Sequence, residues 1–211
     1  MAEQLGLRQR QRLRIEQAIQ DAATRLFLRS GFDAVGVNEI AEAAEVSKRT
    51  LFKYFPSKED LVIGAFADHQ NEAANVVRDR AAGTDPIDAL HAHFLDGLAR
   101  RDPVTGLDDH PQTLAFVAMV LSVPSLQGRL LLYQTAAEAA LTEVLEAVVP
   151  AGDDGTARLA AYQIFAVQRA LTDENRRHLT AGMSGDARYP EAVAAADRGF
   201  AMLRHGLSIS G

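Results

Sequence analysis

The sequence AEVSKRTLFKYFPSKEDL, Ala44–Leu61, holds four cations, three aromatic residues and two helix-start signals within eighteen positions. Ser47 stands before a short helical pattern at 48–54, where a side-chain oxygen caps free backbone amides. Leu51 and Phe55 are spaced to face a core, and the cations fall on the remaining positions. The stretch therefore predicts a short, capped helix with one apolar side and one cationic side.

A second short helix, VNEIAEAA at 37–44, precedes this one. Ile40 and Ala41 are expected to face inward, and Ala44 allows close contact between the helices. Glu45 and Val46 form the turn, with Val46 as a buried plug. Two short helices joined by a tight turn, the second of them cationic, are typical of a helix-turn-helix.

A recognition helix reads DNA through side chains that reach base edges in the major groove. Lys48 and Arg49 can donate hydrogen bonds to guanine, and Thr50 can touch thymine or a phosphate. Tyr54 and Lys58 are expected near the phosphate backbone. A solvated basic face on a structural helix is the plainer interpretation. We favour DNA contact, because the positions of the Ser47 cap, the Val46 plug and the inward residues leave the cations together on the outer side of the helix.

The charge of the chain is unevenly distributed. Residues 1–58 carry a net charge of +3 and the remainder −9, which gives −6 for all 211 residues. The basic part includes Arg8, Arg10, Arg12 and Arg14, which precede or open the first helix. We expect this run to follow the backbone or a minor groove of a nucleic acid.

Helical periodicity recurs along the chain and strand-like alternation does not persist, so the predicted fold is all-α with about nine helices. A Ser57 cap with Asp60 three residues later predicts one long helix to about Arg80. RDPVTGLDDHP, 101–111, is expected to be a loop or a single helical turn. The other expected helices span 8–30, 87–100, 112–123, 124–149, 158–179 and 191–207, with a break at AGMSGDARYP, 181–190.

GFDAVGVNEIAEAAEVSKRTLFKYFPSKEDL, 31–61, resembles the DNA-binding domain of the TetR family of bacterial transcriptional regulators. The resemblance implies a three-helix DNA-binding domain at 1–56 and a helical effector-binding and dimerisation domain at 57–211. It also implies a homodimeric repressor that binds operator DNA and is released by a small molecule. The expected DNA contacts are Gly36, Val37, Ser47, Lys48, Arg49, Thr50, Lys53, Tyr54 and Lys58.

The sequence departs from the family pattern at three positions. Glu45 stands where the family usually has Gly, and a side chain at positive φ costs roughly 1 kcal/mol. Gly36 replaces the usual Thr or Ser, and Phe52 replaces the usual Tyr, so two hydroxyls are missing. We expect DNA affinity to depend more on Arg49, Lys53, Tyr54, Lys58 and the N-terminal arginines.

The segment LAAYQIFAVQRAL, 159–171, is apolar on nearly every side, which is typical of a helix buried on several faces. Its mixture of aromatic and hydrogen-bonding residues is also typical of small-molecule sites. Ordinary core is the alternative for each residue. The expected pocket lining is Phe94, Phe116, Met119, Val120, Tyr133, Tyr162, Phe165, Gln168 and Arg169.

The last helix carries two stripes at helical spacing, one of large apolar residues and one of small residues. One stripe can serve the chain's own core, and the small seam lets a second helix approach closely; both can also be core. The resemblance implies a dimer through the last two long helices. The expected interface residues are Ala192, Ala195, Gly199, Phe200, Met202 and Leu203.

Enzymatic and metal-binding functions find little support. His91 and His93 lie two residues apart on a helix, which turns them roughly 200° from each other, so they cannot share one ion. We expect no catalytic residue, metal, cofactor or membrane span, and a cytoplasmic location that fits the absence of cysteine. Two alternatives stay open, an activator and a helical small-molecule carrier whose DNA binding has decayed.

Overall fold

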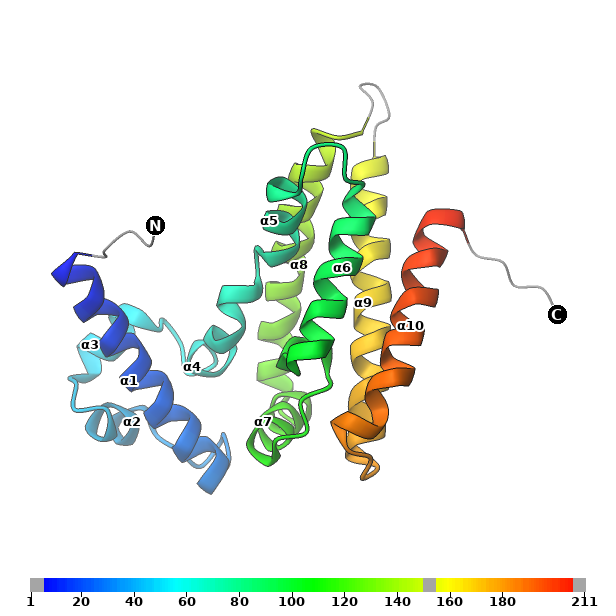
Figure 1. Cartoon of the computed structure of the whole chain (residues 1–211). Coiled ribbons are helices and arrows are strands. Elements are labelled where there is room, and N and C mark those ends of the chain that lie inside the picture. Colours follow the sequence, from blue (N-terminus) through cyan, green and yellow to red (C-terminus); the bar gives the residue numbers. More distant parts are fainter. Residues whose placement is uncertain (1–5, 150–154, 207–211) are drawn as a thin grey trace. The chain divides into compact units, whose positions relative to one another are not determined.

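The computed structural model describes residues 6–149 and 155–206. In these residues it contains ten α-helices, two 3-10 helices and no strand (Figure 1), which confirms the all-α prediction. The elements are α1 Leu7–Ser30, α2 Val37–Ala43, α3 Lys48–Tyr54, α4 Asp60–Ile63, η1 Gly64–His69, α5 Glu72–Asp79, α6 Pro86–Arg100, η2 Pro103–Thr105, α7 Pro111–Ser122, α8 Pro124–Glu146, α9 Thr156–Thr180 and α10 Gly185–His205.

The chain divides into two compact units. The first comprises Met1–Asp68 and Ala115–Leu132, and the second comprises His69–Leu114 and Tyr133–Gly211. Helices α7 and α8 contribute residues to both units. The boundary expected between residues 56 and 57 separates a DNA-binding part from an effector-binding and dimerisation part. This functional boundary stays a prediction.

The first unit is built around α1, which packs against both α2 and α4. Its N-terminal half is exposed, whereas its C-terminal half supplies Ile19 and Phe27 to the core. α2 packs against α1 and α3 packs against α2, which completes a three-helix core. The buried apolar residues of α1 to α3 and their connections are Ile19, Ala22, Ala23, Leu26, Phe27, Phe32, Val35, Ile40, Ala41, Leu51 and Phe55.

In the second unit, α10 packs against α9 and α6, and α5 packs against α6 (Figure 1). Phe200 lies at the centre of this core, with its ring centre 6.0 Å from that of Phe94. Three charged or polar residues are buried as well, namely Thr105, Asn175 and Arg188.

The prediction of one long helix from Ser57 to Arg80 is wrong, because this segment is divided into α4, η1 and α5. Gly64 marks the change: a Cβ there would lie 3.1 Å from the Phe55 ring and 3.3 Å from the Gln20 amide nitrogen. The absence of a side chain lets the backbone approach α1 and α3, and Gly also weakens helix continuity.

The last helix begins at Gly185, so the break expected at 181–190 is too long. Ser184 caps it by accepting a hydrogen bond from the Ala187 amide at 3.2 Å. Pro190 lies inside the helix, close to its N-terminus, where its missing N–H removes one backbone bond. Leu207, the expected end of this helix, lies outside the described residues.

The polar loop 101–111 contains η2 and is anchored in the second unit. The Thr172 hydroxyl donates to the Val104 carbonyl at 3.0 Å, and the Asn175 amide donates to the Thr105 carbonyl at 3.0 Å. A Cβ on Gly106, which has φ 72°, would lie 2.3 Å from the Thr172 carbonyl oxygen. This close approach explains the glycine.

Candidate nucleic-acid interface

The turn between α2 and α3 takes the expected geometry. The Val46 amide donates to the Ala41 carbonyl at 2.9 Å, which closes the turn. Glu45 has φ 54°, so this non-glycine residue occupies a left-handed conformation. Val46 is half-buried where full burial was expected.

Ser47 caps α3 as predicted. Its hydroxyl oxygen accepts a hydrogen bond from the Thr50 amide at 3.0 Å and lies 2.8 Å from the Thr50 hydroxyl. Leu51 is fully buried and Phe55 nearly so, which confirms the inward face of the helix. Because the Thr50 hydroxyl already has a partner in Ser47, its methyl group is the part left for other contacts.

The outer face of α3 presents Lys48, Arg49 and Lys53, all of them exposed. Within residues 6–149 and 155–206, none of the three forms an ion pair. Tyr54 is half-buried beside them. A shallow surface hollow is lined by Arg49, Thr50, Phe52 and Lys53. Unpaired cations that surround a hollow are the electrostatic footprint expected for a polyanion.

Lys58 differs from the other cations because it is half-buried over two aromatic rings. Its ammonium nitrogen lies 4.4 Å from the centre of Phe32 and 5.8 Å from that of Phe27. It also precedes α4, which begins at Asp60 and has four residues, so the expected placement in the first turn of a long helix is wrong. The helix dipole therefore adds little attraction for an anion here.

Ser57 and Asp60 form the expected capping box. The Asp60 amide donates to the Ser57 hydroxyl at 3.1 Å, and the Ser57 amide donates to the Asp60 carboxylate at 3.0 Å. Arg129 of α8 lies 2.6 Å from the same carboxylate. This ion pair holds the start of α4 against α8 within the first unit, and the sequence did not predict it.

The N-terminal arginines lie on a helix, because α1 begins at Leu7. Arg8 and Arg12 share one side of it, whereas Arg10 and Arg14 share another. All four are exposed. A helix about 10–12 Å across does not enter a minor groove about 6 Å wide. Contact with the phosphate backbone or with a minor groove would therefore be made by the arginine side chains alone, and both expected modes stay predictions.

Gly36 and Val37 begin α2. Gly36 occupies the cap position with φ −88° and ψ 148°, and no side chain caps this helix. A Cβ on Gly36 would meet nothing within 4 Å. The site therefore has room for the Ser or Thr that the family pattern has there.

The residues expected to line a pocket are divided between the units. Phe116, Met119 and Val120 belong to the first unit, where the Phe116 ring stacks on Phe66 at 6.0 Å. The other six belong to the second unit. There Phe94 is buried in the core and Tyr162 is 47% exposed. The remaining four are Tyr133, Phe165, Gln168 and Arg169, of which Arg169 pairs with Glu138 at 3.5 Å. The pocket stays a prediction.

The residues expected at a dimer interface also differ in burial. Ala192 and Phe200 lie in the chain's own core, with exposures of 1% and 0%. A Cβ on Gly199 would lie 2.9 Å from a Val167 methyl, so the small seam accommodates α9 of the same chain. Ala195 and Leu203 are partly buried, and Met202 is 44% exposed. Of the six residues, Met202 has the side chain that is most available to a second chain.

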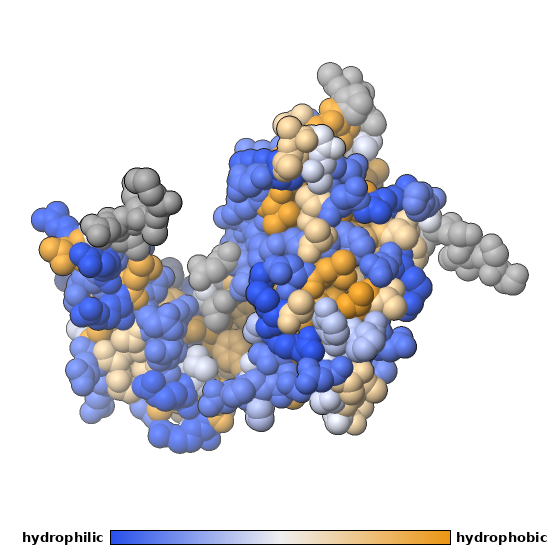
Figure 2. Space-filling model, viewed as in Figure 1, coloured by the Kyte–Doolittle hydropathy of each residue, from blue (hydrophilic) through white to orange (hydrophobic). Residues whose placement is uncertain are grey.

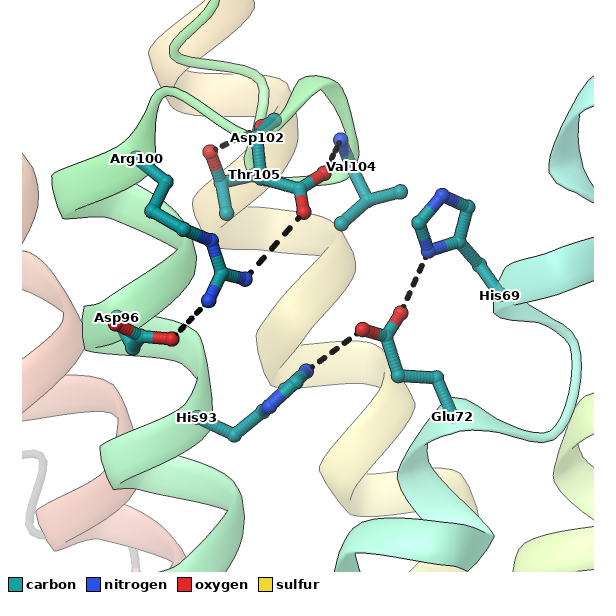
Figure 3. Close-up of polar contacts among 8 residues, drawn as sticks. All are labelled: His69, Glu72, His93, Asp96, Arg100, Asp102, Val104 and Thr105. Atoms are coloured by element: carbon teal, nitrogen blue, oxygen red, sulfur yellow. Dashed lines mark hydrogen bonds and ion pairs between the residues drawn. The ribbon is translucent and has the colours of Figure 1, made fainter. Parts of the chain in front are cut away.

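A carboxylate bridges two histidines where η1 meets α5 (Figure 3). Glu72 accepts hydrogen bonds from His69 at 2.7 Å and from His93 of α6 at 2.9 Å. These bonds, that from His69 above all, lower the pKa of Glu72 from 4.5 to about 2. The Glu72 hydrogen bond in turn raises the pKa of His93 above 6.5.

The neighbouring His91 points elsewhere, with its Nε2 2.9 Å from Asp197. The expectation that His91 and His93 cannot share an ion agrees with their different partners. Within the described part of the chain, no group of three or more His, Cys, Asp or Glu residues is arranged to hold a metal ion.

Comparison with known proteins places this helix-turn-helix in a family. The profile of "Bacterial regulatory proteins, tetR family" matches residues 19–65. Over 172 residues, the chain is 30% identical to the HTH-type transcriptional regulator TcmR of Streptomyces glaucescens, covering 80% of this chain and 76% of TcmR. This chain belongs to the TetR family of transcriptional regulators.

Two further similarities extend this result. The HTH-type transcriptional repressor KstR of Rhodococcus jostii (strain RHA1) is 43% identical over 89 residues, 41% of each chain. The structure of a SmeT–triclosan complex aligns with a TM-score of 0.59 over 93% of this chain and 95% of that one, at 14% identity. The second similarity shows that this TetR-family chain shares the SmeT fold along most of its length.

Among the described helices of this regulator, no single helix is both long enough and apolar enough to cross a membrane. Pro111–Ser122 and Pro124–Glu146 reach that composition only as a pair, across a 96° bend. The second unit presents apolar patches on a mostly hydrophilic surface in the view of Figure 2.

Proposed function

We propose that this protein is a homodimeric repressor that binds operator DNA through α3 and is released by a small molecule. The observation that carries the DNA contact is the outward face of α3, where Lys48, Arg49 and Lys53 have no ion-pair partner in the described structure. Exposed cations gathered on one helix face without a neighbouring carboxylate give that face a positive potential, which attracts a polyanion such as DNA.

The side chains form two groups, according to the part of the DNA that each can contact. Lys48 and Arg49 lie at the start of the recognition helix, where side chains meet base edges in the major groove. Lys53, Tyr54 and Lys58 follow and are assigned to phosphates. Ser47 holds the helix start in shape, and Gly36 and Val37 place the start of α2 near the backbone.

Two copies are needed because operator half-sites lie about 34–36 Å apart. The partner surface is assigned to α9 and α10. Their exposed apolar side chains include Leu159 at 60%, Tyr162 at 47% and Met202 at 44% exposure. Apolar side chains gathered on exposed helix faces favour a protein interface over solvent.

Release by a small molecule is supported by the relatives. KstR is named a repressor, and SmeT was solved with triclosan. By linkage, an effector that weakens DNA binding must itself bind less tightly to the DNA-bound protein, by the same factor. Regulation of bacterial DNA also implies a cytoplasmic location.

A mobility-shift assay on the gene's own upstream DNA, repeated over a range of salt concentrations, tests the DNA contact. We expect a dimer–DNA complex that weakens steeply as salt rises. Lys53→Ala should weaken binding to every sequence, whereas Arg49→Ala should also relax the preference at one base pair. A protein that stays monomeric, or that binds all duplexes equally, contradicts the proposal and favours a carrier with decayed DNA binding. Increased transcription from the bound promoter would identify an activator.

A further inference from the structure

Phe52 is exposed on the outer face of the recognition helix. Its relative exposure is 39%, while its neighbour Leu51 is fully buried. The inward face of α3 is already filled by Leu51 and Phe55. In the described chain, Phe52 takes part in no ring–ring or cation–π contact. The ring therefore lies outside the packed core of the first unit.

The position of Phe52 on the helix places it among the cations. At about 100° per residue, Lys48, Arg49, Phe52 and Lys53 fall within a sector of roughly 140°, and Leu51 lies outside it. Phe52 also lines the same surface hollow as Arg49, Thr50 and Lys53. Any duplex that contacts Arg49 and Lys53 must therefore approach the phenyl ring closely.

A phenyl ring has a narrow choice of partners in DNA. It has no hydrogen-bond donor or acceptor, so it cannot satisfy phosphate oxygens or the polar edges of the bases. In the major groove, the apolar group that distinguishes one base from the others is the C5-methyl of thymine. Burial of the ring against that methyl removes apolar surface of both partners from water.

We propose that Phe52 is a specificity-determining residue that packs against the C5-methyl group of one thymine in each half-site. The inference rests on the proposed function, because it requires α3 to lie in the major groove. It assigns base discrimination to a side chain that carries no charge and no hydrogen-bonding group. Arg49 reads a neighbouring base pair by hydrogen bonds, so the two side chains contribute to specificity independently.

Deoxyuridine substitution tests this assignment directly, because it removes the thymine methyl and leaves base pairing and every hydrogen-bonding group in place. Full-length protein first selects its preferred duplex from a random-sequence library. Each thymine of that duplex is then replaced singly, in both half-sites, by deoxyuridine. We expect one position per half-site at which wild-type affinity falls about threefold to tenfold.

The Phe52→Ala variant should bind the parental duplex more weakly and should show no further loss at that deoxyuridine. Phe52→Leu, which keeps an apolar side chain, should retain most of the sensitivity. Arg49→Ala should keep the full deoxyuridine effect while losing discrimination at its own base pair. Circular dichroism should show the same helical content for all variants, since Phe52 and Arg49 are both exposed.

Two results overturn the inference while leaving the proposed function intact. One is a wild-type protein that binds its selected duplex but is indifferent to deoxyuridine at every position. The other is a Phe52→Ala variant that retains the full deoxyuridine penalty. If the selection yields no preferred duplex at all, the proposed function itself fails, and the role of Phe52 fails with it.

Discussion

The ammonium nitrogen of Lys58 lies 4.4 Å from the centre of the Phe32 ring, over the edge of the three-helix core. Cation–π contacts of this kind contribute about 0.5–1 kcal/mol at exposed sites. Lys58 therefore has a structural role in the first unit, whether or not it also contacts DNA. A single substitution at this position will mix both effects unless a control separates them.

Lys58→Met should lower the free energy of unfolding by about 0.5–1 kcal/mol, because it keeps the apolar stem but loses the charge above the rings. If Lys58 also contacts a phosphate, the slope of log K against log salt should become shallower by about 0.9. Lys53→Met is the matched control: it should change the slope without changing stability, because Lys53 is exposed. Equal stability of the two variants in urea would contradict the structural role of Lys58.

Glu45→Gly should stabilise the protein by about 0.5–1 kcal/mol, because Gly relieves the left-handed conformation at φ 54°. Glu45→Ala serves as the control, since it removes the charge but keeps the Cβ atom. Both variants should bind DNA more tightly if the turn lies near phosphates. Only Glu45→Gly should raise the urea concentration at the midpoint of unfolding. An Ala variant as stable as the Gly variant would show that charge, and not backbone conformation, is the cost at this position.

Ser47→Ala should cost about 1 kcal/mol, because the Thr50 amide loses its side-chain acceptor. Ser47→Asp should preserve stability, since Asp is also a good cap, yet it places a negative charge beside Lys48 and Arg49. We therefore expect this variant to fold normally and to lose DNA affinity. Urea unfolding reports the effect of each substitution on the helix cap, and DNA binding reports its effect on the interface. Wild-type DNA affinity in Ser47→Asp would mean that the start of α3 stays away from phosphates.

Glu72→Gln should destabilise the second unit by roughly 1–2 kcal/mol near pH 6, after allowance for partial solvent screening. The pKa of Glu72 is lowered to about 2, so its contribution is present above pH 4.5 and is lost as the pH falls toward 2. The pKa of His93 is raised above 6.5, so its contribution is present below that pH and is lost as the pH rises through the folded-state value.

The network is therefore strongest between about pH 4.5 and 6.5, and urea unfolding from pH 4 to 9 should show a maximum that Glu72→Gln flattens. Glu174→Gln is the control. The pKa of Glu174 is also lowered by a histidine, His178, but that pair lies within one helix and does not join two elements. A pH profile of Glu72→Gln that parallels wild type would refute this coupling between α5 and α6.

Local signals made the helix-turn-helix predictable. The Ser47 cap and the inward Leu51 and Phe55 are consequences of residues a few positions apart, whereas the left-handed conformation of Glu45 was expected from the family resemblance. Backbone capping, helical spacing and turn conformation act at this range, so one sequence is enough to recognise them. The same reasoning found the Ser57–Asp60 capping box.

Contacts between residues that are far apart in the sequence could not be predicted from such local signals. The small residues of the last helix fit either a second chain or the chain's own α9, and periodicity alone cannot choose between them; the position of Val167 beside Gly199 shows contact with α9. Likewise, the loop 101–111 is polar by composition, but hydrogen bonds from Thr172 and Asn175 anchor it.

The amino-acid sequence by itself determined that the chain is helical and that a capped, cationic helix follows a tight turn, because those features depend on neighbouring residues. The tertiary structure alone decided where the 57–80 segment breaks, which cation lies over an aromatic ring and which side of α10 is left exposed. Each of these depends on side chains brought together from distant positions, and one pattern of apolar and small residues is compatible with several such arrangements.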